Sequence, residues 1–406
     1  MTNKGRDAAK WRGRAVLFLV SQCITLFGST LVQMAIVWYV TLETASGAWV
    51  AAFSVCSYLP QFLISFVGGV WADRYSRKRL IIGADAAIAV VTLGMMFLMP
   101  RISDETAVFG ALLGMSVLRS FGAGIQTPAV NAVIPQLVTE GQRMRYNGIN
   151  ATMQSVVQFA APAVAGALLS TRPLRATLLV DALTAALGIG LLAAVRLPDR
   201  QPAGEERSSV FVDMRMGVRY AFSDGMIGRL LVVYGLFIFL CVPAGFLAQL
   251  LVRRVYGDTY WYLTAVELVG FSGMMLGGVL MSVWGGFQSR VRTLWTGLLA
   301  FGVLAAGMGL SRNFGLYLAL MALYGVALTA VQTATTTLIQ EKTEASMQGR
   351  VFGLMGSMYS GFLPIGMAVF GPMADAVPLE WIMVFSGVAL MCIAAAVRTN
   401  GRFREG

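Results

Sequence analysis

Four ionisable side chains lie inside long apolar stretches of this sequence, where a charge is costly. Arg119 falls near the middle of one stretch, and Asp85, Asp181 and Glu267 fall in three others. Placing an arginine at the centre of a bilayer costs about 2.5–3.5 kcal/mol, so such residues commonly serve binding, ion pairing or proton transfer. Because the sequence contains no histidine, the three acids are the candidate proton carriers. The four residues are therefore candidates for a cavity and for proton coupling.

Three of these residues also have a structural interpretation. Arg119 can be a structural residue whose guanidinium is held by backbone carbonyls. Asp85 follows a basic loop and is expected to pair with it. Asp181 is expected to pair with Arg172 or Arg175 near the end of its stretch.

Glu267 is the acid that we select for proton coupling. It follows an aromatic run at 260–262, which is typical of a membrane–water interface, by about 8 Å of helix. Its sequence neighbours are apolar, an environment in which a carboxyl group can load and release a proton. Two alternatives remain: Glu267 contacts a cationic substrate, or it pairs with Arg253 or Arg254.

Uncharged polar side chains recur at helical spacing along several of the apolar stretches. Because unpaired polar groups are costly in lipid, such faces are expected to line water or protein. Hydrogen bonding between helices is the structural alternative. The candidate lining residues of a substrate cavity are Gln22, Gln33, Gln126, Gln154, Gln158 and Gln332.

The composition indicates what kind of protein carries these residues. Of 406 residues, 57% are hydrophobic and only 13% are charged, whereas soluble domains have about 45–50% apolar and about 25% charged residues. This composition excludes an ordinary soluble enzyme and indicates a polytopic membrane protein. The four cysteines are far apart and form no CxxC pair, so we expect no metal site, disulfide framework or cofactor.

Twelve apolar runs are long enough to cross a bilayer, which needs about 20 residues each. They predict an all-α membrane protein with twelve transmembrane helices in two six-helix bundles. The predicted parts are an N-terminal bundle (1–195), a cytoplasmic linker with an amphipathic helix (196–227) and a C-terminal bundle (228–406). The runs lie near 14–40, 49–71, 80–99, 107–128, 148–170, 175–195, 228–251, 262–284, 292–311, 314–338, 351–371 and 377–397.

The distribution of basic residues predicts the orientation. Most of the 31 lysines and arginines lie in the two terminal segments and in the loops on the same side as the termini. Because cytoplasmic loops carry this excess, both termini are predicted to be cytoplasmic. The same rule explains the net charge of +11 without nucleic acid.

The sequence lacks the motifs of several other classes of protein. No P-loop occurs, so ATP is not expected to drive the protein directly. A membrane enzyme is disfavoured because the sequence shows no nucleophile–base or metal-ligand cluster. We expect a monomer whose partners are the bilayer, protons and a small amphipathic molecule.

The stretch GVWADRYSRK at 69–78 resembles the signature loop of the major facilitator superfamily, except that Ser76 replaces the second glycine. The resemblance implies that Asp73 docks near 349–350, at the start of the eleventh span, and stabilises one side of an alternating-access cycle. We single out Gly69, Asp73, Arg74, Arg77 and Lys78 as this conformational switch.

Further motifs extend the resemblance. Arg119 lies in a segment similar to the arginine motif of that superfamily's fourth helix, and 159–166 resembles the Gly-Pro motif of its antiporters. Over essentially the whole chain, strings such as QMAIVWYVT and QEKTEASMQGRVFGLMGSM look like the bacterial macrolide-efflux type. The resemblance implies a proton-coupled efflux transporter of the bacterial cytoplasmic membrane that exports an amphipathic, macrolide-like compound. The alternatives are an exporter of an endogenous metabolite or siderophore, and a non-transporting membrane sensor with this fold.

Overall fold

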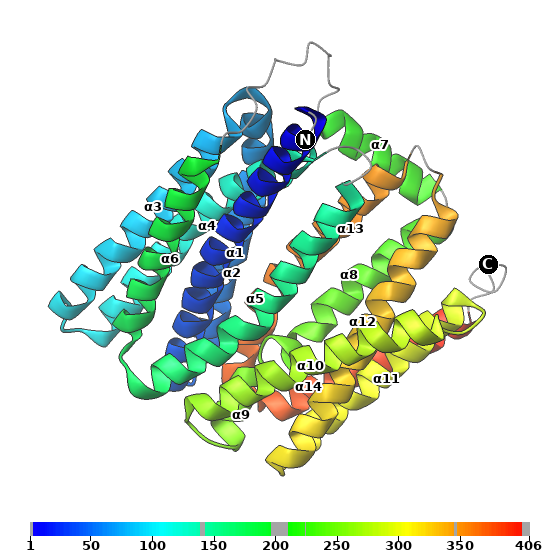
Figure 1. Ribbon diagram of the computed structural model, residues 1–406. Coiled ribbons are helices and arrows are strands. Elements are labelled where there is room, and N and C mark those ends of the chain that lie inside the picture. The colour runs from blue at the N-terminus through cyan, green and yellow to red at the C-terminus, as the bar shows by residue number, and fades with distance from the viewer. Residues whose placement is uncertain (1–2, 139–142, 196–209, 224, 345–346, 400–406) are drawn as a thin grey trace. The chain divides into compact units, whose positions relative to one another are not determined.

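The computed structural model describes residues 3–138, 143–195, 210–223, 225–344 and 347–399, and the regular elements in these ranges are all helices (Figure 1). The predicted all-α fold is confirmed. The elements of the first part of the chain are α1 (Asn3–Thr44), α2 (Gly47–Arg74), α3 (Arg77–Leu98), the short 3-10 helix η1 (Met99–Arg101), α4 (Glu105–Leu137), α5 (Arg143–Thr171) and α6 (Leu174–Ala194).

The remaining elements follow the linker. They are α7 (Val210–Ser223), α8 (Gly225–Gly245), α9 (Ala248–Val255), α10 (Tyr260–Trp284), α11 (Arg290–Leu310), α12 (Phe314–Lys342), α13 (Gln348–Ala376) and α14 (Leu379–Thr399). Within the described ranges, twelve helical segments are long and apolar enough to cross a membrane. The predicted number of spans is therefore confirmed, with α8 and α9 forming one segment. The short helix expected in the linker is α7, whereas 196–209 lies outside the described residues.

The chain forms two compact units. Unit 1 comprises 1–40 and 53–204, and unit 2 comprises 41–52 and 205–406. The turn at 41–52 therefore groups with unit 2, although the helices that it joins belong mainly to unit 1. The predicted bundle boundaries assigned this turn to the N-terminal bundle, and those boundaries stay a prediction.

In unit 2, α11 packs against α14 and α12, and α10 packs against α12. Glycine permits the closest approach. A Cβ atom on Gly302 of α11 would lie 2.5 Å from the carbonyl oxygen of Gly387 on α14. Without a hydrophobic driving force between helices in lipid, such close backbone packing is a main source of association. In unit 1 the corresponding interfaces are those of α3 with α4 and α6.

Candidate functional site

A buried ion pair joins three helices of unit 1. Arg119 on α4 donates from Nη1 to Asp181 Oδ2 on α6 and to Thr92 Oγ1 on α3. Thr92 Oγ1 also lies 3.1 Å from Asp181 Oδ2. Asp181 is 1% exposed, so each charge has its counter-charge in a place where an isolated charge would be very costly.

The expected pairing of Asp181 with Arg172 or Arg175 is wrong. Arg175 lies on the same helix, α6, but six residues earlier, which at 100° per residue places it on a different face. Both arginines are exposed, whereas Asp181 points toward α3 and α4. Helix periodicity therefore separated the acid from the basic residues that are nearest in sequence.

The contact between α3 and α4 sets the position of Arg119. A Cβ atom on Gly122 would lie 2.6 Å from Ile88, so the missing side chain lets the two helices approach closely. Because the helices run antiparallel, residues after Ile88 on α3 face residues before Gly122 on α4. This register brings Thr92 opposite Arg119.

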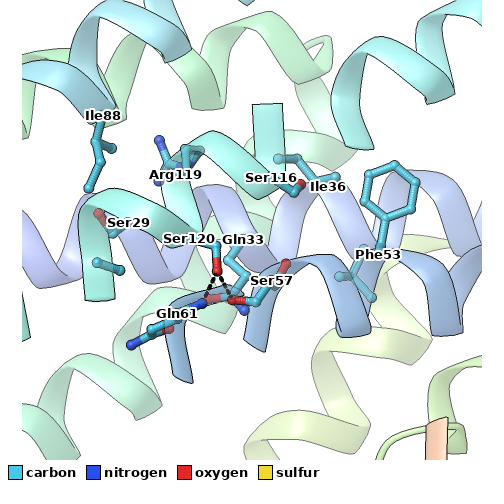
Figure 2. A pocket seen from close by; sticks show the side chains of 12 residues that line it. Ser29, Gln33, Ile36, Phe53, Ser57, Gln61, Ile88, Ser116, Arg119 and Ser120 are labelled. Atoms are coloured by element: carbon cyan, nitrogen blue, oxygen red, sulfur yellow. Dashed lines mark hydrogen bonds between the residues drawn. The ribbon is translucent and has the colours of Figure 1, made fainter. Parts of the chain in front are cut away.

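A cavity of about 70 Å³ in unit 1 opens beside this ion pair. Its lining mixes hydroxyl and amide groups with apolar side chains, and Figure 2 shows them converging from α1, α2, α3 and α4. Arg119 contributes the only charged side chain among the lining residues. The lining consists of Ser29, Gln33, Ile36, Val37, Phe53, Ser57, Gln61, Ile88, Ser116, Arg119, Ser120 and Ala123.

Helix α2 is opened at this cavity by a side chain from α4. The Ser120 hydroxyl accepts from the Gln61 N–H (2.7 Å) and donates to the Ser57 carbonyl (2.7 Å), the two groups that would otherwise bond to each other within α2 (Figure 2). Pro60 lies beside the opening and has no N–H of its own. Insertion of a side chain into the helical ladder is a known cause of helix bending. Ser120 thus shapes the cavity as well as lining it.

The other buried acid of unit 1 is Asp85 on α3. It is 4% exposed, and its Oδ1 accepts from Gln126 Nε2 at 2.6 Å. Its Oδ2 is buried with no hydrogen-bond partner among the described residues. The expected pairing with the basic loop is wrong, because the carboxyl is held by Gln126 on α4, and Arg77 and Lys78 donate to helix carbonyls instead.

The predicted glutamines are distributed differently. Gln33 lines the cavity, and Gln126 holds Asp85. Gln22 is buried, with Nε2 3.3 Å from the Ser21 hydroxyl. Gln154 and Gln158 on α5 are exposed, and Gln332 on α12 is partly buried in unit 2.

Two basic residues of the loop at 69–78, Arg77 and Lys78, bind backbone carbonyls near the ends of helices. Arg77 donates to the carbonyls of Ala72, in the last turn of α2, and of Ala132, five residues before the end of α4. Lys78 donates to the carbonyls of Ala193 (2.7 Å) and Val195 (2.8 Å) at the end of α6. Cations near the C-terminal end of a helix interact favourably with its last carbonyls and with the helix dipole. Arg77 and Lys78 therefore tie three helix ends together, a role that the sequence did not reveal.

The other switch residues of this loop are Gly69, Asp73 and Arg74. A Cβ atom on Gly69 would meet nothing within 4 Å, so this glycine is not needed for close packing. Gly68 makes the close contact instead, since its Cβ would lie 2.5 Å from the Gly124 carbonyl oxygen. The predicted docking of Asp73 concerns a side chain that lies outside the described residues. Arg74 is exposed.

In unit 2, Glu267 on α10 is partly buried and accepts from Gln249 Nε2 on α9. The alternative pairing with Arg253 or Arg254 is wrong. Arg253 donates to the Leu42 carbonyl, and Arg254 pairs with Asp375. Within the described residues Glu267 has an amide partner and no ion pair.

Sequence reasoning missed several of these residues. Gln249 could have been found, because it is a lone amide in the apolar run 240–252. Asp375 was overlooked because the predicted span ended at 371, whereas α13 continues to Ala376. Thr92 and Ser120 carried no signal, since hydroxyl groups are common in apolar helices.

Comparisons with known proteins agree with this architecture. Residues 18–367 match the family model of the Major Facilitator Superfamily. The chain is 29% identical over 387 residues to Macrolide efflux protein A of Streptococcus pyogenes, covering 95% of each chain. It is 22% identical over 412 residues to the multidrug efflux pump Tap of Mycolicibacterium fortuitum, covering 97% of each chain.

Solved structures share the fold at low sequence identity. The nucleoside transporter NupG has a TM-score of 0.75 at 12% identity, over 95% of this chain and 99% of NupG. A bacterial homologue of the lysosomal transporter Spinster has a TM-score of 0.70 at 17% identity, over 96% of each chain. With twelve apolar spans and a family match over most of its length, the chain belongs to the Major Facilitator Superfamily of multi-pass membrane transporters.

Proposed function

We propose that this protein exports an amphipathic small molecule, such as a macrolide-like compound, across the bacterial cytoplasmic membrane in exchange for protons. The observation that carries the proposal is the 29% identity to Macrolide efflux protein A over 95% of both chains. The relationship to a multidrug efflux pump over 97% of both chains supports export of a drug-like molecule. Both termini face the cytoplasm in this proposal, and the working unit is a monomer.

The cavity of unit 1 suits part of an amphipathic substrate. Ser29, Gln33 and Ser116 offer hydrogen bonds, whereas Ile36 and Phe53 offer apolar contact. A pocket that combines apolar walls with a few polar groups is typical of small-molecule sites. At about 70 Å³ it has room for a small group of a large substrate, such as an ester group.

Proton coupling is assigned to Glu267. Asp181 is committed to Arg119, so protonating it would break a buried ion pair. Among the described residues Glu267 has the Gln249 amide as its partner and no ion pair, so it can change charge without leaving one of their cations unpaired. Asp85 is the second candidate, because its Oδ2 has no partner among the described residues.

A susceptibility panel in a pump-deficient bacterial host tests the exported substrate. Expression of the protein is expected to raise resistance to macrolides more than to unrelated dyes. Unchanged resistance to every drug, together with altered siderophore or metabolite in the medium, would instead support the endogenous-exporter alternative. Unchanged resistance and unchanged secretion would favour a non-transporting sensor.

A further inference from the structure

The short helix α9 has polar contacts at both ends. In its first turn, Gln249 donates to Glu267 on α10. In its last turn, Arg253 donates to the Leu42 carbonyl (3.1 Å), and Arg254 donates to the Ala45 carbonyl (3.1 and 2.7 Å). Because α9 has only eight residues, about 6 Å of rigid helix separates the Glu267 contact from the contacts to the 41–52 turn.

The 41–52 turn is held by a cluster that we call the turn clamp, made of Arg253, Arg254 and Asp375. Asp375 accepts from the Gly47 N–H (2.6 Å), the Ala48 N–H (2.9 Å) and the Ser46 hydroxyl (2.8 Å), and it pairs with Arg254 at 2.7 Å. A carboxylate at these amides caps the first turn of α2.

Two features show that the turn is tightly specified. Ala45 has φ = 47°, a left-handed conformation that alanine rarely adopts. Its carbonyl receives the two bonds from Arg254, which offset the strain. A Cβ atom on Gly47 would lie 2.2 Å from the Gly371 carbonyl oxygen. The turn is therefore held both by hydrogen bonds and by close backbone packing within unit 2.

The contacts of Gln249 distinguish the two charge states of Glu267. Gln249 is 7% exposed, its Nε2 donates to Glu267 Oε1, and its own Oε1 is buried with no partner among the described residues. A carboxylate can only accept, so it leaves that amide oxygen unsatisfied. A protonated carboxyl can accept the N–H and donate its O–H to the amide oxygen, which satisfies both groups.

The helices around Glu267 offer its carboxyl no cationic partner among the described residues. The helices that pack on α10 are α9 and α12. On α12, the Met321 side chain lies next to Gly270. Tyr317, one turn before Met321, is close enough to interact electrostatically with Glu267, one turn before Gly270. The Tyr317 hydroxyl is buried without a partner in the described residues, and Tyr256 packs on its ring at 5.3 Å. Neither helix pairs a lysine or arginine with the carboxyl among the described residues.

We propose that Gln249 is a positioning residue that recognises the protonated form of Glu267 and, through α9, links that proton to the turn clamp. A proton on Glu267 favours the conformation in which α9 and the 41–52 turn are held together. Loss of the proton favours release of the turn, because a bare carboxylate is better solvated when the site opens to water. The inference rests on the proposed proton-driven transport and specifies how its coupling residue acts.

Hydrogen exchange of the 41–52 amides in the purified full chain, in lipid nanodiscs without drug, tests this link. Rates are corrected for the intrinsic pH dependence of exchange. Acidification is expected to slow exchange in 41–52 by about tenfold, which corresponds to one pH unit of linked proton binding. Glu267→Gln, whose neutral amide can both accept from Gln249 Nε2 and donate to Gln249 Oε1, is expected to show slow exchange at every pH.

Gln249→Met is expected to abolish the pH response, whereas Gln340→Met, which replaces an exposed amide on α12, leaves it unchanged. Protonation of Asp375 would have the opposite effect, because it would weaken the carboxylate's hydrogen bonds to the turn and speed exchange on acidification. The direction of the change therefore distinguishes the two acids. An undiminished response in Gln249→Met, or faster exchange in acid, contradicts the proposal. If exchange in the wild type does not depend on pH while drug export still consumes a proton gradient, the proposed link through α9 is wrong and the proposed function stands.

Discussion

Arg119 and Asp181 form an ion pair that is enclosed by α3, α4 and α6 and borders the cavity of unit 1. The pair explains how an arginine can be tolerated in the middle of an apolar span, since the nearby acid offsets its charge. It also places one guanidinium both in the helix packing and at a cavity wall. A substrate that contacts Arg119 therefore contacts a group that joins three helices.

Removing one member of this pair is expected to destabilise the protein by about 3–5 kcal/mol, because the other charge stays buried and unpaired. Arg119→Gln should lower the temperature at which the detergent-solubilised protein aggregates. The double variant Arg119→Gln, Asp181→Asn should regain much of the lost thermal stability. Both variants should lose export. If the double variant exports normally, the pair is structural only.

Ser120 offers a second test of the cavity. Ser120→Ala removes the hydroxyl that bridges the Ser57 carbonyl and the Gln61 N–H, and is expected to cost about 1–3 kcal/mol if those groups stay unpaired. Ser116→Ala is the matched control, because the Ser116 hydroxyl bonds within α4 to the Leu112 carbonyl. The melting temperature and the export rate should fall more for Ser120→Ala than for Ser116→Ala. Equal effects would argue against an opening of α2 at Ser120.

Asp73 is expected to act on conformation and not on folding. Asp73→Asn should strongly reduce export while membrane abundance stays near that of the wild type. Quantitative blotting together with drug accumulation measures the two effects separately. Normal export by this variant would mean that the loop at 69–78 serves only topology and the helix-end contacts of Arg77 and Lys78.

The orientation can be tested with reporters. A phosphatase or fluorescent reporter joined after Gly406, or inserted within 200–210, is expected to report a cytoplasmic location, because the basic loops lie on that side. An insertion within 102–104, between η1 and α4, should report the opposite side. A periplasmic signal at Gly406 would overturn the predicted orientation.

The sequence predicted the helices better than their contacts. Apolar runs of about 20 residues suffice to predict twelve spans, because lipid requires every backbone group to be paired within its own helix. The cost of a charge in lipid also identified Arg119. Its partner Asp181 could not be assigned, because the pairing depends on how α4 and α6 each pack against α3. That is decided by packing at positions such as Gly122, where no charge pattern gives a signal.

The same reasoning explains the errors at the other acids. Proximity in sequence suggested basic partners for Asp85 and Glu267, but both accept from amides on neighbouring helices, Gln126 and Gln249. Asp375 was missed because α13 extends beyond its apolar run. Hydropathy reports where a segment meets lipid, whereas polar contacts at helix ends depend on the next helix.

Drug-evoked proton movement in everted membrane vesicles shows directly whether protons drive export. In vesicles with an acidified interior, adding a macrolide is expected to dissipate part of the pH gradient when the wild-type protein is present. Glu267→Gln vesicles are expected to bind drug and leave the gradient intact. Drug accumulation that continues after an uncoupler has collapsed the gradient would show that protons do not drive export, and an equal proton release by Glu267→Gln would show that Glu267 does not carry the proton.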